Sequence, residues 1–513
     1  MLLSTKTQHK SLKKIKSIPK KTTVIKRSFV LVKQRKMVAK RRRRVFLKSR
    51  KGLLRSSFVT KRVVRRRFQS KGTAGKKFIL KRKLTAKRSF IPNRRNSLRR
   101  VNLLSSRLRR RSLQSKSLRR RRLLKRRIMP KVIVPPVVSQ VNRMQNGINL
   151  IGYIRTEIGI GEGSRLMAKA IEAADIPFLV MNYTDAGAQS ARNLDLSWQH
   201  KEAIDPLYRV NLIHLNADAL PGAHVNLGHN LFHERCNIGY WAWELAEFPD
   251  EWCGSFQYLQ EVWVPTAFIT DAVSRKSTIP VIRIPHAIEV SNATEVNREI
   301  FGLPQHQFLF LSMYDTHSLI ERKNPLAAIK AFKLAFPKTN RSVGLVIKVN
   351  NASSNEQQMN HLRQQIEGYD NIYLIHETMN RALVNVLINS TDCFVSLHRS
   401  EGFGLVLAEA MYMGKPVIGT GWSGNMDFMN AVNSCPIKYQ LLPIGRDIGP
   451  YKANQIWAEP DIEHAAFFMG RLVKDERWRN EIAFNGQQTI RTDFSAQVVG
   501  NMVRQRLNIL GKL

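Results

Sequence analysis

The sequence predicts an α/β protein whose folded part has two halves, each built on a parallel sheet with helices packed against it. Short apolar runs alternate with helical patterns from residue 147 onwards, which is the order of βαβ units. Two of the expected strands lead into glycine-bearing turns that open into helices, at 159–163 and at 401–404. An abrupt change in composition near residue 130 separates the two halves from a basic N-terminal segment.

This N-terminal segment, residues 1–146 with a proline-bearing linker at its end, carries most of the positive charge. Residues 1–130 hold 50 of the 85 Lys and Arg and no Asp or Glu, and the first carboxylate of the chain is Glu157. Charges of one sign at this density repel each other, so we expect a disordered arm. Three roles stay open: an inert tail, attachment to an anionic membrane surface, and nucleic-acid binding. No nucleic-acid fold or zinc module is recognisable in the arm, so the nucleic-acid role has only the charge in its favour.

The cysteines indicate a reduced protein. Cys236, Cys253, Cys393 and Cys435 form no CxxC pair, and Cys393 lies in an apparent core strand. No apolar run approaches the roughly 18 residues that a membrane-spanning helix needs. The first residues also lack the hydrophobic core of a secretory signal. We therefore expect a cytoplasmic protein, held peripherally on the inner face of a membrane if the arm binds lipid.

The first half, residues 147–289, is expected to contain strands at INLIGYI, PFLVMNY, RVNLIHL, NIGYWAWE, EVWVP and PVIRIP. Helices are expected at 250–259 and 267–274. After the first strand, Gly159, Gly161 and Gly163 precede a helical pattern. Such a turn can bring backbone N–H groups close to a phosphate or an acceptor. An ordinary tight turn explains the three glycines equally well, because the dinucleotide fingerprint spacing is absent.

The segment GYWAWELAEFP places Glu244 where a strand is expected to end, at the edge on which parallel sheets carry functional groups. Glu244 is therefore a candidate site residue. The alternative is that Trp241 and Trp243 belong to the core and Glu244 caps the next turn. The histidines of this half are candidate polar contacts without metal-ligand spacing: His214, His224, His229, His233 and His286.

The second half, residues 290–492, begins with the strand FLFLSMYD, and further strands are expected at GLVIKVN, NIYLIHE and CFVSLHR. A helix is expected from Pro325 to Ala335, with proline suitably placed in its first turn. Arg322 and Lys323 then lie just ahead of a helix N-terminus, where they predict an anion site. Lys348, at the end of the next strand, is either a further phosphate contact or a solvated residue.

The stretch from His398 to Phe428 reads as strand, turn, helix and strand. Glu401 lies in the turn, and Glu409 lies eight residues later on a helix that begins near Gly404. The helix start would direct the backbone N–H groups of Gly402, Phe403, Gly404 and Leu405 at a ligand. Glycine at two of these positions leaves room for a close approach.

Three segments of the second half resemble glycosyltransferase family 4: FLFLSMYDTHSLIERKNPLAAI, CFVSLHRSEGFGLVLAEAMYMGKPVIGTGWSGNMDF and WAEPD. GYWAWELAEFP and VPTAFITDAV of the first half are also similar to members. The resemblance covers residues 147 to about 510. It implies the GT-B arrangement of two Rossmann-like domains facing across a cleft, with the acceptor on 147–289 and the donor on 290–492. A C-terminal helix, 493–513, should return to the first domain and bury Val498, Met502 and Leu507.

The resemblance further implies retaining transfer of a hexose from a UDP- or GDP-sugar to a glycan or lipid-linked acceptor, with no metal or other cofactor. In the family, the glutamate matching Glu409 binds the ribose hydroxyls and the one matching Glu401 lies against the transferred sugar. Arg322 and Lys323 match the basic pair that binds the diphosphate, while Met313 stands where many members carry a further arginine. The body has no aspartate-x-aspartate pair, as expected without Mg²⁺. The rival interpretation is a polyanion-binding protein whose transferase body no longer catalyses.

Overall fold

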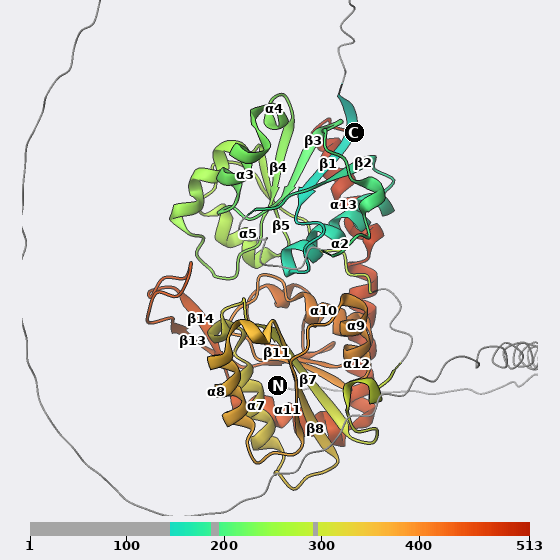
Figure 1. Cartoon of the computed structure of the whole chain (residues 1–513), viewed down its shortest axis with the longest axis vertical. Coiled ribbons are helices and arrows are strands. Elements are labelled where there is room, and N and C mark those ends of the chain that lie inside the picture. Colours follow the sequence, from blue (N-terminus) through green and yellow to red (C-terminus); the bar gives the residue numbers. More distant parts are fainter. Residues whose placement is uncertain (1–143, 186–193, 291–295) are drawn as a thin grey trace, which may run out of the picture. The chain divides into compact units, whose positions relative to one another are not determined.

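Two parallel sheets of six strands each carry the folded part of the chain (Figure 1). The computed structural model describes residues 144–185, 194–290 and 296–513. The N-terminal arm, with the three roles considered for it, therefore lies outside the described residues. The predicted α/β architecture with two Rossmann-like sheets is confirmed.

The first sheet has the strand order β2-β1-β3-β4-β5-β6, and all neighbouring strands run parallel. Side chains on both faces of its central strands are buried, as Leu150 and Ile151 of adjacent positions show with 0 % exposure. Burial on both faces explains why these strands read as continuous apolar runs. The elements of this half are β1 (Gln145–Gly152), α2 (Gly159–Ala173), β2 (Phe178–Asn182), β3 (Tyr208–His214), α3 (Leu220–Leu227), α4 (His229–Phe232), β4 (Cys236–Tyr240), β5 (Glu261–Val264), α5 (Ala267–Ser274) and β6 (Val281–Arg283).

The second sheet has the order β12-β11-β10-β7-β8-β9 and is also parallel throughout. The strand at 308–315 and the helices at 267–274 and 325–335 have the predicted bounds. The elements of this half are β7 (Phe308–Asp315), α6 (Ile320–Lys323), α7 (Pro325–Ala335), β8 (Val343–Asn350), α8 (Glu356–Ile366), β9 (Ile372–Ile375), α9 (Arg381–Asn389), β10 (Cys393–Ser396), α10 (Leu405–Tyr412), β11 (Val417–Thr420), β12 (Cys435–Ile437), α11 (Ile462–Lys474) and α12 (Glu476–Asp493).

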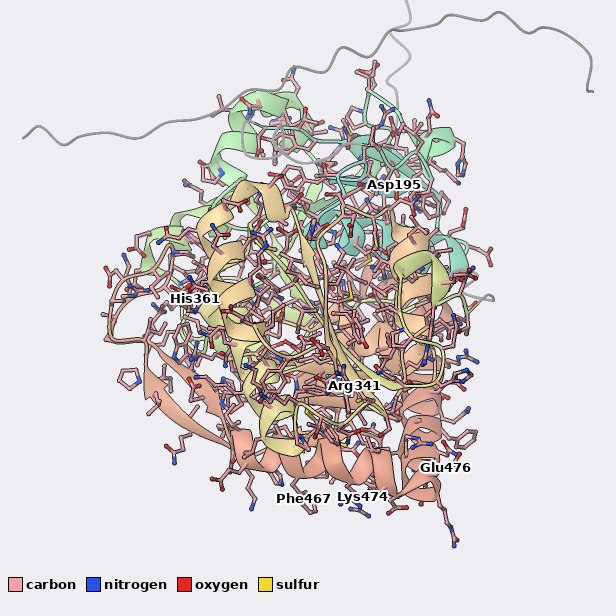
Figure 2. The ribbon with its side chains drawn as sticks, turned by 60° about the horizontal axis from the view of Figure 1, so that its bottom comes forward. Asp195, Arg341, His361, Phe467, Lys474 and Glu476 are labelled. Atoms are coloured by element: carbon pink, nitrogen blue, oxygen red, sulfur yellow. The ribbon has the colours of Figure 1, made fainter. Side chains whose placement is uncertain are left out.

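A two-stranded antiparallel ribbon, β13 (Tyr439–Pro443) and β14 (Ile456–Pro460), accompanies the second sheet (Figure 1). The sequence did not predict it as a hairpin. The outer helices α11 and α12 follow, and Lys474 and Glu476 mark their junction in Figure 2. In the same view the side chain of Phe467 points outward from helix α11, and it is 60 % exposed.

The C-terminal helix α13 (Ala496–Ile509) packs on the core of the first half. Its buried stripe differs from the predicted one, because Val499, Val503 and Leu507 are buried whereas Val498 is 38 % exposed. Met502 is only partly buried at the edge of this core. The register is fixed by Gly500, at which a Cβ atom would lie 2.1 Å from the carbonyl oxygen of Ala170 in α2. The prediction was therefore one residue out of phase at two positions.

Two further expectations in the first half need correction. The helix expected at 250–259 is a 3₁₀ helix, Asp250–Tyr258. The strand expected to run to Glu244 ends at Tyr240, after which Trp241 and Trp243 turn into the core with exposures of 0 % and 1 %. Both tryptophans pack on Phe248. They are core residues, and Glu244 lies in the loop beyond the strand.

Candidate active site

The turn after β10 is held in place by its own buried side chains. His398 lies between Ser396 and Asn425, with its ring nitrogens 3.0 and 3.1 Å from their side-chain oxygens. Burial lowers the pKa of His398, so the ring is neutral near pH 7. Gly404 ends the turn as the residue before α10, with φ of +92°, a conformation that glycine adopts without the strain of a side chain.

Arg322 and Lys323 meet Glu401 of this turn. The Lys323 Nζ atom lies 2.5 Å from Glu401 Oε1, and Arg322 Nη1 lies 3.4 Å from Glu401 Oε2. Arg322 also donates to the carbonyl oxygen of Ser400 at 2.9 Å. The two cations lie just ahead of α7, as the sequence indicated, and they are also the last residues of the short helix α6. Asn324, in the left-handed conformation with φ of 50°, separates them from α7.

Glu244 of the first half approaches the same guanidinium. Its Oε1 atom lies 3.7 Å from Arg322 Nη2, and its Oε2 atom accepts a hydrogen bond of 3.1 Å from Tyr451. The Ser400 hydroxyl donates to the backbone carbonyl of Glu244. Carboxylates from both halves therefore surround Arg322, whose Nε atom has no hydrogen-bond partner among the described residues.

The charges of this cluster stabilise one another. Burial alone would raise the pKa of Glu401, but Lys323 and Arg322 outweigh it and lower that pKa to about 2. Burial would also lower the pKa of Arg322, yet Glu244, Tyr451 and Glu401 raise it above its ordinary value. The cluster thus holds two cations and two carboxylates. The anion that we expected beside Arg322 and Lys323 is supplied here by the protein itself.

Glu409 lies in a second, separate charged group on α10. It is 2 % exposed and forms an ion pair through Oε1 with Arg381, the first residue of α9. Its other oxygen, Oε2, has no hydrogen-bond partner among the residues described. Burial raises the pKa of Glu409 to about 7, against the opposing effect of Arg381. An ionisable, buried oxygen without a partner can accept hydrogen bonds from a hydroxylated ligand.

Arg381 also reaches the first half, because its Nε atom lies 3.9 Å from Glu162 Oε1 on α2. Glu162 is held in place by Arg165, whose Nη2 atom lies 2.7 Å from Oε2. Sequence reasoning did not single out Arg381 or Glu162. Their partners are far away in the chain and no local spacing marks them; Glu162 had only its position between Gly161 and Gly163 to draw notice.

The turn from Gly402 to Leu405 presents a helix N-terminus. No acceptor for the N–H groups of Phe403, Gly404 and Leu405 lies among the described residues. Gly402 packs on the first half, since a Cβ atom there would lie 2.7 Å from the Trp243 carbonyl oxygen. Thr266 donates to the Gly402 carbonyl at 2.9 Å. The glycine at 402 therefore admits a neighbouring backbone, and its carbonyl oxygen makes the contact with Thr266.

Lys348 belongs to a different group of side chains. It is 2 % exposed, and its Nζ atom lies 2.9 Å from Asn350 Oδ1, while Asn350 donates to Asp315 at 2.8 Å. Burial lowers the pKa of Lys348 to about 8. No contact among the described residues joins Lys348 to Glu401, Arg322 or Lys323, so its part in phosphate binding stays a prediction. It is not a solvated lysine.

The three glycines that were predicted to form a turn, Gly159, Gly161 and Gly163, all lie inside α2. Packing explains two of them. At Gly161 a Cβ atom would lie 2.1 Å from the Thr156 carbonyl oxygen. At Gly163 it would lie 2.8 and 2.9 Å from the buried rings of His214 and His286. Gly159, at the exposed start of the helix, has open space around it, and its role near an acceptor or phosphate stays a prediction.

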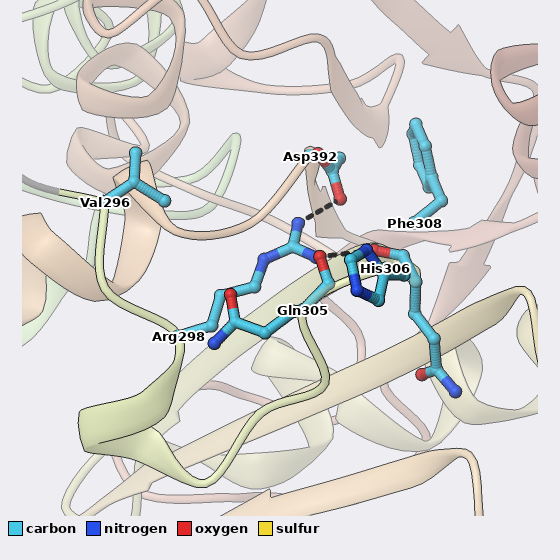
Figure 3. Close-up of a pocket in the computed structure, with 7 residues that line it drawn as sticks. Val296, Arg298, Gln305, His306, Phe308 and Asp392 are labelled. Atoms are coloured by element: carbon cyan, nitrogen blue, oxygen red, sulfur yellow. Dashed lines mark hydrogen bonds and ion pairs between the residues drawn. The ribbon is translucent and has the colours of Figure 1, made fainter.

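The pocket in Figure 3 lies elsewhere, at the amino ends of β7 and β10. Its walls include Arg298, which forms an ion pair of 2.7 Å with Asp392 and donates to the carbonyls of Gln305 and Gln307. Arg298 thus anchors a loop. Ligands of parallel sheets bind at the opposite, carboxyl edge, where Arg322 and Glu401 lie.

Metal-ligand clusters and membrane helices are both missing from the described part of the chain. No group of three or more His, Cys, Asp or Glu side chains in 144–185, 194–290 and 296–513 is arranged to hold a metal ion. Within these ranges no helix is sufficiently long and apolar to cross a membrane. The four cysteines are free thiols.

Comparison with known proteins identifies the architecture. Residues 294–432 match the sequence model of the family described as Glycosyl transferases group 1. The first half aligns with solved structures together with the second: the protein HepE from Anabaena, in complex with UDP and glucose, is 14 % identical and has a TM-score of 0.53, with 71 % of this chain and 100 % of that chain covered. The fold is GT-B.

Other GT-B structures agree with this assignment. Sucrose-phosphate synthase from Thermosynechococcus elongatus has a TM-score of 0.50 at 13 % identity, over 72 % of this chain and 99 % of that one. A glycosyltransferase from Rickettsia africae has a TM-score of 0.53 at 12 % identity, over 71 % and 99 %. No curated protein sequence matches. The range matched by the family model contains Arg322, Lys323, Glu401, Glu409 and Arg381.

Proposed function

We propose that this protein is a retaining glycosyltransferase of the family 4 type, which moves a hexose from a UDP- or GDP-sugar to a glycan or lipid-linked acceptor. The observation that carries the proposal is the cluster of Arg322, Lys323 and Glu401 at the carboxyl edge of the second sheet, in contact with Glu244 of the first half. Arg322, Lys323 and Glu401 lie within the range that matches Glycosyl transferases group 1.

In this proposal the second half binds the donor. Glu409 Oε2, which has no partner among the described residues, would accept hydrogen bonds from the ribose hydroxyls. The N–H groups of Phe403, Gly404 and Leu405 point from the start of α10 and would donate to the sugar or the phosphate. Glu401 would lie against the transferred sugar. Neighbouring GT-B structures were solved with UDP or UDP-glucose, which supports UDP-sugars as the first donors to test.

Arg322 and Lys323 would stabilise the diphosphate as it leaves. Negative charge develops on the leaving phosphate during bond cleavage, and cations placed there in advance lower the barrier. The same two charges would serve in place of a divalent cation, so we propose that no metal is required. Retention would follow from attack on the face that the leaving group vacates, with the departing phosphate accepting the proton of the acceptor hydroxyl. No protein nucleophile takes part.

Glu244 would then act from the acceptor side. Its contact with Arg322 is the longer of the two carboxylate contacts, 3.7 Å against 3.4 Å for Glu401. Without a donor it balances the charge of Arg322, and a bound diphosphate would take over that balance. Glu244 would thereby be released toward an acceptor hydroxyl at the boundary of the two halves.

Calorimetric titration of the full-length chain with UDP, GDP and their glucose and mannose derivatives tests the proposal. We expect one nucleotide series to bind and Glu409→Ala to weaken it. GDP and UDP share the diphosphate and the ribose. Binding of both with equal affinity would therefore show that the protein contacts these groups and does not distinguish the bases. If no nucleotide binds, the protein is a non-catalytic one, and its arm becomes the feature to study.

A further inference from the structure

Arg381 is the one residue whose side chain contacts both Glu409 and Glu162, which come from opposite halves of the described structure. It is the first residue of α9, where the side chain of Asn380 caps the helix by accepting from Leu383 N at 2.9 Å. The cap fixes where the arginine leaves the backbone. Its side chain as a whole is 36 % exposed.

The ion pair uses only half of the Glu409 carboxylate. Arg381 contacts Oε1, and Oε2 is buried without a partner among the described residues. A buried carboxylate oxygen without a partner destabilises the empty protein, so such an atom needs a functional explanation. A guanidinium on one oxygen keeps the charge on the carboxylate and fixes its orientation, which leaves the other oxygen aimed at a ligand.

We propose that Arg381 is the positioning residue of the donor site: it keeps Glu409 ionised and oriented for the ribose hydroxyls, and it ties this carboxylate to Glu162 on the facing half. This inference rests on the proposed function, because it takes Glu409 as the ribose ligand. Arg381 itself does not contact the reacting atoms.

The charges around Glu409 determine in which direction each substitution should shift its pKa. The other titratable side chain of its own helix is Tyr412, whereas Arg381 of α9 and Glu162 of α2 are the charged groups that act on its titration. Arg491 of α12 lies over the Tyr412 ring, and His286, near Glu162, is kept neutral by burial. Arg381 favours the ionised form of Glu409, whereas Glu162 and burial favour the protonated form.

Two substitutions should therefore shift the pH dependence of nucleotide binding in opposite directions. Arg381→Gln removes the charge that ionises Glu409, so the midpoint of the affinity change near pH 7 should move to higher pH. Glu162→Gln removes a competing negative charge, so the midpoint should move to lower pH. Titration of the phosphates of the nucleotide is common to all variants and drops out of the comparison.

The experiment is calorimetric titration of full-length wild type, Arg381→Gln, Arg381→Lys and Glu162→Gln with UDP and with GDP, from pH 5.5 to 9. At pH 7 we expect Arg381→Gln to weaken binding by about 10- to 100-fold, as for loss of a charge-assisted hydrogen bond. This loss of affinity should become smaller towards pH 9, because Glu409 is then ionised in the variant as well. Arg381→Lys, which keeps the charge, should lie between wild type and Arg381→Gln. Arg341→Gln is the matched control, because Arg341 pairs with Asp370 at an exposed site.

Three results would overturn the inference. Unchanged affinity in Arg381→Gln would remove the residue from the donor site. A loss that is equal at every pH would make its role purely structural. Tighter binding would mean that Arg381 occupies the ribose position and has to leave. Each of these differs from failure of the proposed function, in which wild type binds neither nucleotide or Glu409→Gln binds like wild type. If Arg381→Gln does not fold, Arg381→Lys decides the matter, because wild-type affinity in that variant at pH 7 would contradict the positioning role.

Discussion

Arg322 and Glu244 lie 3.7 Å apart across the boundary between the two halves. Arg322 follows the first strand of the second sheet, and Glu244 follows the fourth strand of the first. Each was a candidate site residue for its own local reason, and the fold brings them together. The carboxyl edges of both sheets therefore contribute to one charged cluster, to which Lys323 and Glu401 also belong.

Stability at low pH should depend on Glu401. The pKa of this side chain in the folded protein is about 2, below its value in the unfolded chain. The stabilisation is therefore complete above about pH 4.5 and is lost as the pH falls toward 2. It amounts to about 3 kcal/mol. Urea unfolding between pH 6 and 3 should show a smaller loss of stability in Glu401→Gln than in wild type. Parallel curves would contradict the ion-pair assignment.

Glu409 should behave in the opposite way. Its pKa of about 7 lies above that of the unfolded chain, so stability is present at low pH and is lost as the pH rises from about 4.5 to 7. At pH 8 we expect Glu409→Gln to unfold at a higher urea concentration than wild type, with a free energy of unfolding larger by up to about 3 kcal/mol. The variant should also bind nucleotide less tightly. A variant that loses stability at pH 8 would show that the Arg381 pair outweighs burial. Such exchange of stability for function is common at active sites.

Gly404 should be required for the shape of the turn before α10. Its φ of +92° strains any residue with a Cβ atom, and an added Cβ would lie 2.7 Å from Leu407 Cδ1. Gly404→Ala should destabilise the protein by about 1–2 kcal/mol and weaken nucleotide binding, because the N–H groups of α10 would be displaced. Gly470→Ala is a control, as nothing lies near a Cβ at this helical position. Equal effects in the two variants would argue against a special turn.

The docking of α13 can be tested by two substitutions on one helix. Leu507 is fully buried against the first half, and Val498 is 38 % exposed. Leu507→Ala should lower the free energy of unfolding by about 2–5 kcal/mol, whereas Val498→Ala should change it by no more than about 0.5 kcal/mol. Thermal unfolding distinguishes the observed phase of the helix from the one predicted, because the predicted phase requires a large effect at Val498.

The sequence predicted what local patterns determine. The strand at 308–315 and the helix at 325–335 are bounded by strong signals, an apolar run and a proline in the first helical turn. The carboxyl edge of the second sheet could also be found, because Glu401 lies in the turn after an apolar strand and glycines follow it. The roles expected for the individual residues of this edge came from the resemblance to glycosyltransferases.

What depends on distant contacts could not be predicted. Glu401 pairs with Lys323 and Glu409 pairs with Arg381, although Glu401 and Glu409 themselves stand eight residues apart in a single motif. The phase of α13 is set by a close approach of Gly500 to α2, which no periodicity reveals. Gly161 and Gly163 read as a ligand turn, yet they make room for a backbone carbonyl and two histidine rings.

In the proposed function, Arg322 and Lys323 stabilise the leaving diphosphate. The decisive measurement is the rate at which UDP- or GDP-hexose is cleaved by the full-length protein and by the Arg322→Ala, Lys323→Ala double variant at saturating donor. The control is the Lys338→Ala, Arg341→Ala pair on the exposed surface, with thermal unfolding to verify that all proteins are folded. We predict a fall in kcat of about 100-fold or more, the size found when a group that stabilises developing charge is removed. A folded double variant that cleaves the donor at the wild-type rate would contradict the account.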